Sequence, residues 1–224
     1  MKKVLAFCIL AAVPVLAAEG TLTDSERSFL VEQLQLSKKA FLASIDGVTD
    51  AQWKFKASPT SWSIAECAEH IVLSEDFLFG AAQGILKAPA VPRPETSNSE
   101  QDHKLVMMVG DRSHKATAPE QITPSGKFPT PADAARAFTE KRDRDIAYAK
   151  TTTDDLRVHS MKGPMGIMDS YQFLLLMASH TGRHTDQIKE VQANADYPKA
   201  TTAERLNEAL TSLEKYRQAL AAKH

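Results

Sequence analysis

Two helix-capping signals, each followed by a helical spacing of apolar residues, constrain the fold of this chain more than any other feature. In Thr23–Glu26 and Ser63–Glu66 a hydroxyl residue precedes a glutamate by three positions. Each side chain of such a pair can satisfy a free backbone amide of the other at the start of a helix. Apolar residues recur with a helical period after both boxes, so the sequence predicts one helix ending near Gly47 and another ending near Leu86.

Two further long helices are predicted in the second half of the chain. Thr130 followed by Pro131 is typical of an N-cap and a first helical position, and the helix that begins there extends to about Lys150. A glycine- and proline-rich break follows at 163–166, and a long helix is then predicted over 168–193.

The remaining segments complete a helical architecture. Residues 88–130 contain six prolines and predict a long connection with one short helix near 99–109. A last amphipathic helix is predicted to pack on its own bundle or on a second subunit through a leucine stripe formed by Leu206, Leu210, Leu213 and Leu220. No stretch shows sustained strand alternation. The predicted fold class is therefore all-α, an antiparallel four-helix bundle with a long crossover loop and an additional C-terminal helix.

The first residues predict export. Lys2 and Lys3 precede an apolar run over 4–16 that ends in small residues, which is the pattern of a secretory signal peptide. The run is too short to remain in a bilayer as a spanning helix. We therefore expect a signal peptide at 1–18, a single helical domain over 19–224, and a periplasmic or extracellular protein without a stable membrane span.

The charge and the cysteine count of the chain limit which partners and which covalent cross-links can be expected. The formal net charge of −1 gives no indication of nucleic-acid binding, and 43% apolar with 25% charged residues is ordinary for a globular protein. Cys8 lies in the predicted signal peptide, so Cys67 is left alone and no internal disulfide is expected. The fold must then be held together by packing.

Two histidines stand one helical turn apart in the predicted helix over 168–193. At about 100° per residue, His180 and His184 fall on the same stripe as Phe173, the stripe that should face the bundle core. Side chains at this spacing are about 5–6 Å apart at Cβ, which lets both rings reach one ion. On spacing alone, ordinary core histidines and a metal site both remain open. Thr181 stands where a zincin motif needs glutamate.

A site of this kind needs a third protein ligand. His70 is the best candidate, in the helix after the second capping box, although it lies at the edge of that helix's apolar stripe. From that helix alone, a surface histidine is the simpler interpretation.

Two motifs together resemble those of the DinB-like superfamily, a group of four-helix bundles that includes DinB/YfiT-like metalloenzymes. "SWSIAECAEH" carries Trp62, Ser63, Glu66 and His70, and "HTGRHTDQI" carries His180, His184, Gln187 and Ile188. The resemblance covers nearly all of the chain after the signal peptide in helix order and motif spacing. It implies one divalent metal bound through His70, His180 and His184. Predicted export, the proline-rich insert and the last helix depart from the usual family pattern.

Three neutral imidazoles would leave at least one metal position open, which is the arrangement of a catalytic site. Imidazole suits zinc, nickel or iron, so the identity of the ion is open. A metal-dependent hydrolase using an activated water is one reading. A metal-dependent transferase acting on a small thiol, as in some relatives, is the alternative. A third reading has no chemistry: a metal- or partner-binding bundle. The small-molecule substrate stays unnamed, and a homodimer is expected.

Four residues near the three histidines in the motifs are candidates for a role in the site, and for two of them more than one role stays open. Gln187 lies on the histidine face and is predicted to orient a metal-binding side chain without contacting the ion itself. Cys67 is either a fourth ligand or a small core residue, and Trp62 either packs at the start of its helix or forms an aromatic wall of a substrate pocket. Glu66 is assigned to the capping box and not to acid–base catalysis. No catalytic side chain is identified.

Overall fold

The computed structural model describes residues 21–95, 97–113 and 117–221. The predicted signal peptide at 1–18 lies outside them. No helix in the part of the chain that is described is long and apolar enough to cross a membrane.

Four long helices build the bundle, as the sequence predicted. They are α1 (Asp24–Ile45), α3 (Ile64–Ile85), α5 (Pro131–Thr151) and α6 (Ser170–Gln192). The two predicted capping boxes form. The hydroxyls of Thr23 and Ser63 each accept a hydrogen bond from the backbone N–H of the glutamate three residues on, and the side chain of that glutamate accepts one from the backbone N–H of the cap residue. Thr130 caps α5, and Asp169 with Gln172 forms a further box at α6 that the sequence reading did not identify.

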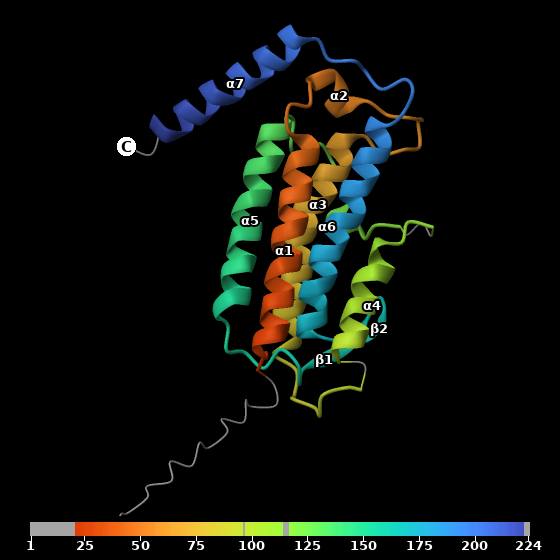
Figure 1. Cartoon of the computed structure of the whole chain (residues 1–224), viewed down its shortest axis with the longest axis vertical. Coiled ribbons are helices and arrows are strands. Elements are labelled where there is room, and N and C mark those ends of the chain that lie inside the picture. Colours follow the sequence, from red (N-terminus) through yellow and green to blue (C-terminus); the bar gives the residue numbers. More distant parts are fainter. Residues whose placement is uncertain (1–20, 96, 114–116, 222–224) are drawn as a thin grey trace, which may run out of the picture.

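The chain path gives two helices in each direction. Figure 1 shows α1 and α6 running up the bundle while α3 and α5 run down it. α3 and α5 can share a direction because the connection between them contains α4 (Ser99–Gly110), which returns the chain along α6. The short helix predicted near 99–109 is therefore confirmed. Its apolar side chains Leu105 and Val109 are buried in the bundle core.

A polar layer divides the core into two apolar clusters. One cluster includes Leu30, Leu78 and Leu174, at the end where α1 and α6 begin. The other includes Phe41, Ile71 and Ile188, at the opposite end. Between them, in sequence order along each helix, lie the buried polar side chains Ser37, Glu75, Arg142 and Thr181. His180 and His184 lie on the same stretch of α6, whereas His70 lies between Ala68 and Ile71 of the second cluster on α3.

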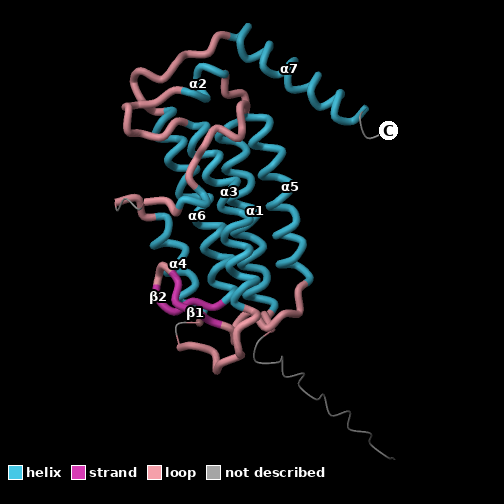
Figure 2. Tube along the Cα trace, turned by 180° about the vertical axis from the view of Figure 1, so that it is seen from behind, coloured by secondary structure: helices cyan, strands magenta, loops and turns pink. Residues whose placement is uncertain are grey.

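Small elements depart from the prediction. β1 (Ser160–Gly163) and β2 (Gly166–Asp169) form an antiparallel hairpin (Figure 2), where the sequence predicted only a break. Strands of four residues are too short to show alternation. The helix α2 (Asp50–Lys54) and the 3₁₀ turn η1 (Glu120–Ile122) were not predicted either.

The last helix, α7 (Thr202–Ala221), extends away from the bundle (Figures 1 and 2). Its leucine stripe faces solvent: Leu206, Leu210, Leu213 and Leu220 are 45–63% exposed. The stripe thus does not pack on its own bundle, which was one of the two expectations. Packing on a second subunit stays a prediction.

Removal of residues 199–224 should leave the stability of the bundle almost unchanged. Within a single subunit the exposed side chains of α7 contribute little to folding, so at a protein concentration low enough to dissociate any dimer we expect the free energy of unfolding to change by less than about 1 kcal/mol. Urea denaturation of the full and shortened chains at two protein concentrations measures this. A loss of more than about 2 kcal/mol at the low concentration would show that the leucines pack on their own bundle, whereas a loss that appears only at the high concentration would show that they pack on a second subunit.

Candidate metal centre

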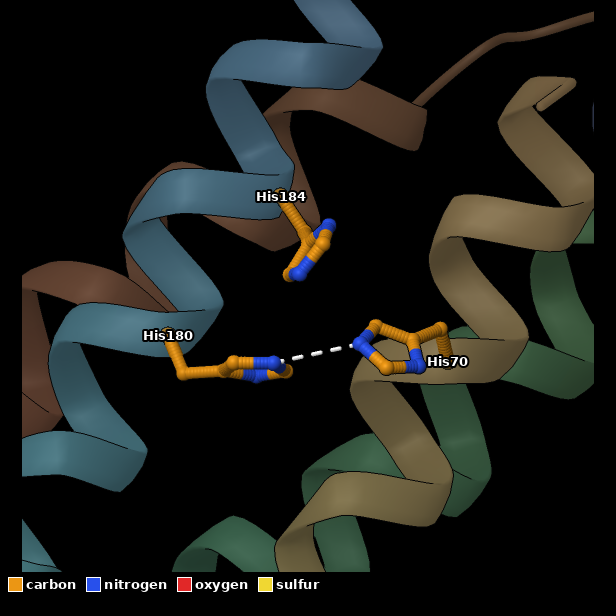
Figure 3. Close-up of side chains that lie close together, drawn as sticks. All are labelled: His70, His180 and His184. Atoms are coloured by element: carbon orange, nitrogen blue, oxygen red, sulfur yellow. Dashed lines mark hydrogen bonds between the residues drawn. The ribbon is translucent and has the colours of Figure 1, made fainter. Parts of the chain in front are cut away.

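Three histidines from two helices converge on one point (Figure 3). His70 comes from α3, and His180 and His184 come from successive turns of α6. Each offers one ring nitrogen, and these three atoms lie within 4.8 Å of one another. His70 is 2% exposed, whereas His180 and His184 are partly exposed, so the cluster reaches the surface along α6.

A main-chain carbonyl fixes the His70 ring. The Nδ1 of His70 lies 2.7 Å from the carbonyl oxygen of Ile122, in the turn η1. A carbonyl only accepts, so Nδ1 carries the proton and donates. The Nε2 of neutral His70 is then left with a free lone pair that faces the other two rings.

A side-chain amide fixes the His184 ring in the same way. The Nδ1 of His184 donates to Oε1 of Gln187 at 2.9 Å, and Arg112 Nη1 approaches the same oxygen at 3.5 Å. The guanidinium only donates, so it favours the amide orientation that presents oxygen to His184. Gln187 thus sits behind His184, where the sequence placed it. Nε2 of neutral His184 is then left with a free lone pair, as in His70.

His180 differs from the other two rings. Its Nε2 is 3.1 Å from Nε2 of His70, and because His70 Nε2 has no proton, His180 donates across this pair. Its Nδ1 is buried and, among the described residues, has no hydrogen-bond partner. That bare nitrogen can take up the ring proton if Nε2 is needed as a ligand.

Burial keeps all three imidazoles neutral. It lowers the pKa of His70, against the opposing effect of the hydrogen bond to Ile122, and it lowers the pKa of His180 well below its ordinary value. The pKa of His184 falls to about 3, first through burial and then through its neighbour His70. Neutral imidazole is the form that binds a metal ion.

The three rings fit a divalent ion. Nitrogens bound tetrahedrally at about 2.1 Å lie about 3.4 Å from one another. The observed 3.1 Å between His70 and His180 meets this spacing, and the limit of 4.8 Å for the set leaves small side-chain rotations to close the rest. Both the donor type and the neutral state suit zinc, nickel or iron.

The other predicted residues occupy distinct places. Trp62 lies beside the cluster, with its ring 4.9 Å from that of His70 and 6.0 Å from that of His184. Cys67 is fully buried in the apolar cluster at this end of the core, where burial raises the pKa of its thiol to about 12. Glu66 caps α3 and pairs with Lys56. It therefore has the capping role that the sequence assigned.

Sequence reasoning missed the groups whose hydrogen bonds fix the orientation of the histidine rings, directly or through another residue. Ile122 acts through its main-chain carbonyl, which no side-chain motif reports. Arg112 lies in the connection after α4, more than 70 positions from Gln187, so only the fold brings them together. Glu69, next to His70, is a charged residue at a buried helix position, and that conflict was a signal open to sequence reading.

A helical bundle with three neutral, convergent histidines defines a class of candidate metalloprotein, and comparison with known proteins gives the family. The family model of the DinB superfamily matches residues 33–188. The chain belongs to the DinB superfamily.

Among solved structures, YfiT from Bacillus subtilis is similar, with a TM-score of 0.52 and 14% identity, over 80% of this chain and 92% of that one. That protein is described as a probable metal-dependent hydrolase with an unusual four-helix bundle topology. At this identity the likeness establishes the fold. No curated protein matches the chain significantly.

Proposed function

We infer that this chain is an exported metal-dependent hydrolase that holds one divalent ion through His70, His180 and His184. The observation that carries this proposal is the convergence of three neutral imidazole rings at a partly exposed point of the bundle. Membership of the DinB superfamily and the fold shared with YfiT support it.

The number of ligands favours catalysis over a purely structural ion. Structural zinc sites are closed by four protein ligands, whereas catalytic sites keep a position open. Within the described residues, the cluster of metal-binding side chains consists of these three histidines. When bound, the ion would supply a Lewis acid able to lower the pKa of a coordinated water towards neutrality.

Other residues of the chain would orient the metal-binding histidines and form a wall of this site. Ile122 and Gln187 fix two ring orientations, so two of the three lone pairs point inward before any ion arrives. Trp62 forms an aromatic wall beside His70 and His184, suited to stack on a flat or apolar part of a small-molecule substrate. Glu66 stays ionised as a helix cap and is not assigned as general base.

Export and self-association complete the proposal. The basic and apolar start of the sequence supports cleavage near residue 18 and a periplasmic or extracellular location. The exposed leucine stripe of α7 supports a homodimer.

The metal content of the purified mature protein tests the site. We expect about one divalent ion per chain in the wild type and in a His103→Ala control, which removes an exposed histidine of α4 stacked on Phe29. The His180→Ala/His184→Ala variant should lose the ion, because a single imidazole does not retain it. Elemental analysis before and after incubation with zinc, nickel and iron gives the answer.

Activity is then measured on ester, amide and phosphate-ester panels. Hydrolysis present in the wild type and absent from the double-histidine variant would support the hydrolase, and transfer to an added small thiol would favour the transferase instead. A wild type that binds none of the three metals would contradict the proposal and leave a non-catalytic bundle.

A further inference from the structure

A segment of the crossover connection lies against the start of α3 and is held by two adjacent residues of that helix. We call residues 117–128 the strap. His70 donates to the Ile122 carbonyl of the strap, and Glu69 binds the strap a few residues further on. The turn η1 forms the first of these attachment points.

Glu69 holds the strap through its backbone. Its Oε1 accepts from the backbone N–H of Ser125 at 2.7 Å and from the Ser125 hydroxyl at 3.1 Å. Its Oε2 accepts from the N–H groups of Gly126 at 2.7 Å and Lys127 at 3.0 Å. Three successive N–H groups thus surround one carboxylate, in the manner of an anion-binding backbone nest.

This arrangement depends on a carboxylate and on the local backbone. Glu69 is 2% exposed, so its four hydrogen bonds replace water that it has lost. Gly126 has φ +88, a conformation that a residue with a side chain rarely adopts. The nest therefore needs both an acceptor-only group at position 69 and glycine at position 126.

The two attachment points are mechanically linked. Only two residues separate Ile122 from Ser125, and the Ile122 side chain is buried, with 5% of its surface exposed. A shift of the nest therefore moves the carbonyl that fixes the His70 ring. Without that acceptor, neutral His70 is free to place its proton on Nε2, the nitrogen that must bind the ion.

We propose that Glu69 is a positioning residue of the three-histidine site: it holds the strap so that the Ile122 carbonyl keeps the proton of His70 on Nδ1 and leaves Nε2 free for a metal ion. This inference rests on the metal site of the proposed function. It also assigns a role to the second part of the proline-rich connection, which the sequence left unexplained.

Three single substitutions test the inference from both sides of the contact. Glu69→Gln keeps the size of the side chain but turns one acceptor into a donor that faces backbone N–H groups. Gly126→Ala alters the strap alone; no atom lies within 4 Å of the added Cβ, so its effect comes from backbone conformation. Asp76→Asn, on the same helix but 52% exposed, is the matched control.

Two readouts are taken on each variant. Zinc affinity by competition with a chelator should fall about 10- to 100-fold in Glu69→Gln and in the same direction in Gly126→Ala, and stay unchanged in Asp76→Asn. In the metal-free protein, long-range ¹H–¹⁵N NMR should show a single His70 tautomer protonated on Nδ1 in the wild type and the control. Both strap variants should show a mixture of tautomers.

The two readouts separate this inference from the proposed function. Unchanged zinc affinity and an unchanged His70 tautomer in folded Glu69→Gln and Gly126→Ala would overturn it. If Glu69→Gln fails to fold, Gly126→Ala decides alone by the same signals. If the wild type binds no metal yet the tautomer changes in the variants, the proposed function fails while the positioning of His70 by Glu69 stands.

Discussion

Replacement of Arg142 by methionine should lower the free energy of unfolding by about 3–5 kcal/mol, because it leaves the Glu75 carboxylate buried without its counter-ion. Both side chains of the pair are fully buried in the polar layer of the core. Nε and Nη2 of Arg142 donate to the two oxygens of Glu75, each at 2.7 Å. The pair is therefore bidentate, the geometry in which arginine and carboxylate interact most strongly.

The remaining donors of Arg142 join the other helices to this pair. Nη1 donates to the Leu34 carbonyl at 3.0 Å and to Ser37 Oγ at 2.7 Å, both on α1, and Nη2 donates to Thr181 Oγ1 at 2.8 Å on α6. All five N–H groups thus have an acceptor. Methionine keeps most of the apolar stem, so the expected loss comes from the unpaired charge and the orphaned acceptors.

A second substitution separates charge from packing. Glu75→Leu combined with Arg142→Met should recover most of the lost stability, since a well-packed apolar pair is often as stable as a buried ion pair. Lys141→Met is the control: its exposed pair with Asp76 should contribute less than about 1 kcal/mol. Urea denaturation measures each variant. A double variant as unstable as Arg142→Met would show that the unpaired carboxylate is not the cause.

The helices were predictable because their signals are local. The pairs Thr23 with Glu26 and Ser63 with Glu66 lie within one turn, and the apolar period that follows them needs no tertiary information. The hairpin at 160–169 gave no such signal, since each strand has only four residues and their burial does not alternate. The α7 leucines did give an apolar stripe, but a stripe does not say what covers it.

The site was predictable only in part for a related reason. His180 and His184 share a helix, so their common direction follows from spacing alone. His70 stood at the edge of its stripe, and only the paired family motifs indicated it. The acceptor behind His70 is a main-chain carbonyl of Ile122, and its position depends on Glu69 binding the strap. Contacts between main chain and distant residues are set by the whole fold.

At the far end of the bundle, Arg157→Leu should cost about 3–5 kcal/mol at neutral pH, because one fully buried guanidinium there faces three carboxylates. Arg157 pairs with Glu26 at 2.8 Å, with Asp169 at 2.9 Å, and with Asp102. It also lies 3.9 Å above the ring of Tyr171. Without it, three acidic groups on α1, α4 and the start of α6 are left close together.

The pH dependence of that loss identifies its cause. Burial alone would raise the pKa of Glu26, but the Thr23 backbone hydrogen bond and the charge of Arg157 bring it down to about 2. A lowered carboxyl pKa contributes stability that is present above about pH 4.5 and is lost as the pH falls towards 2. In Arg157→Leu the part of this contribution that comes from Arg157 disappears, and the three crowded carboxylates take up protons more readily than they do beside the guanidinium. The deficit relative to wild type should therefore be largest near pH 7 and shrink towards pH 4.

Denaturation at pH 7 and pH 4 measures this difference, with Arg93→Leu as the control. Arg93 pairs with the same Glu26 from a 34% exposed position, so its loss should cost no more than about 1 kcal/mol. An Arg157→Leu deficit that is equal at both pH values would mean that the lost stacking on Tyr171 matters and the charge does not. A deficit that shrinks in acid would show that Arg157 stabilises this end of the bundle by neutralising its three carboxylates.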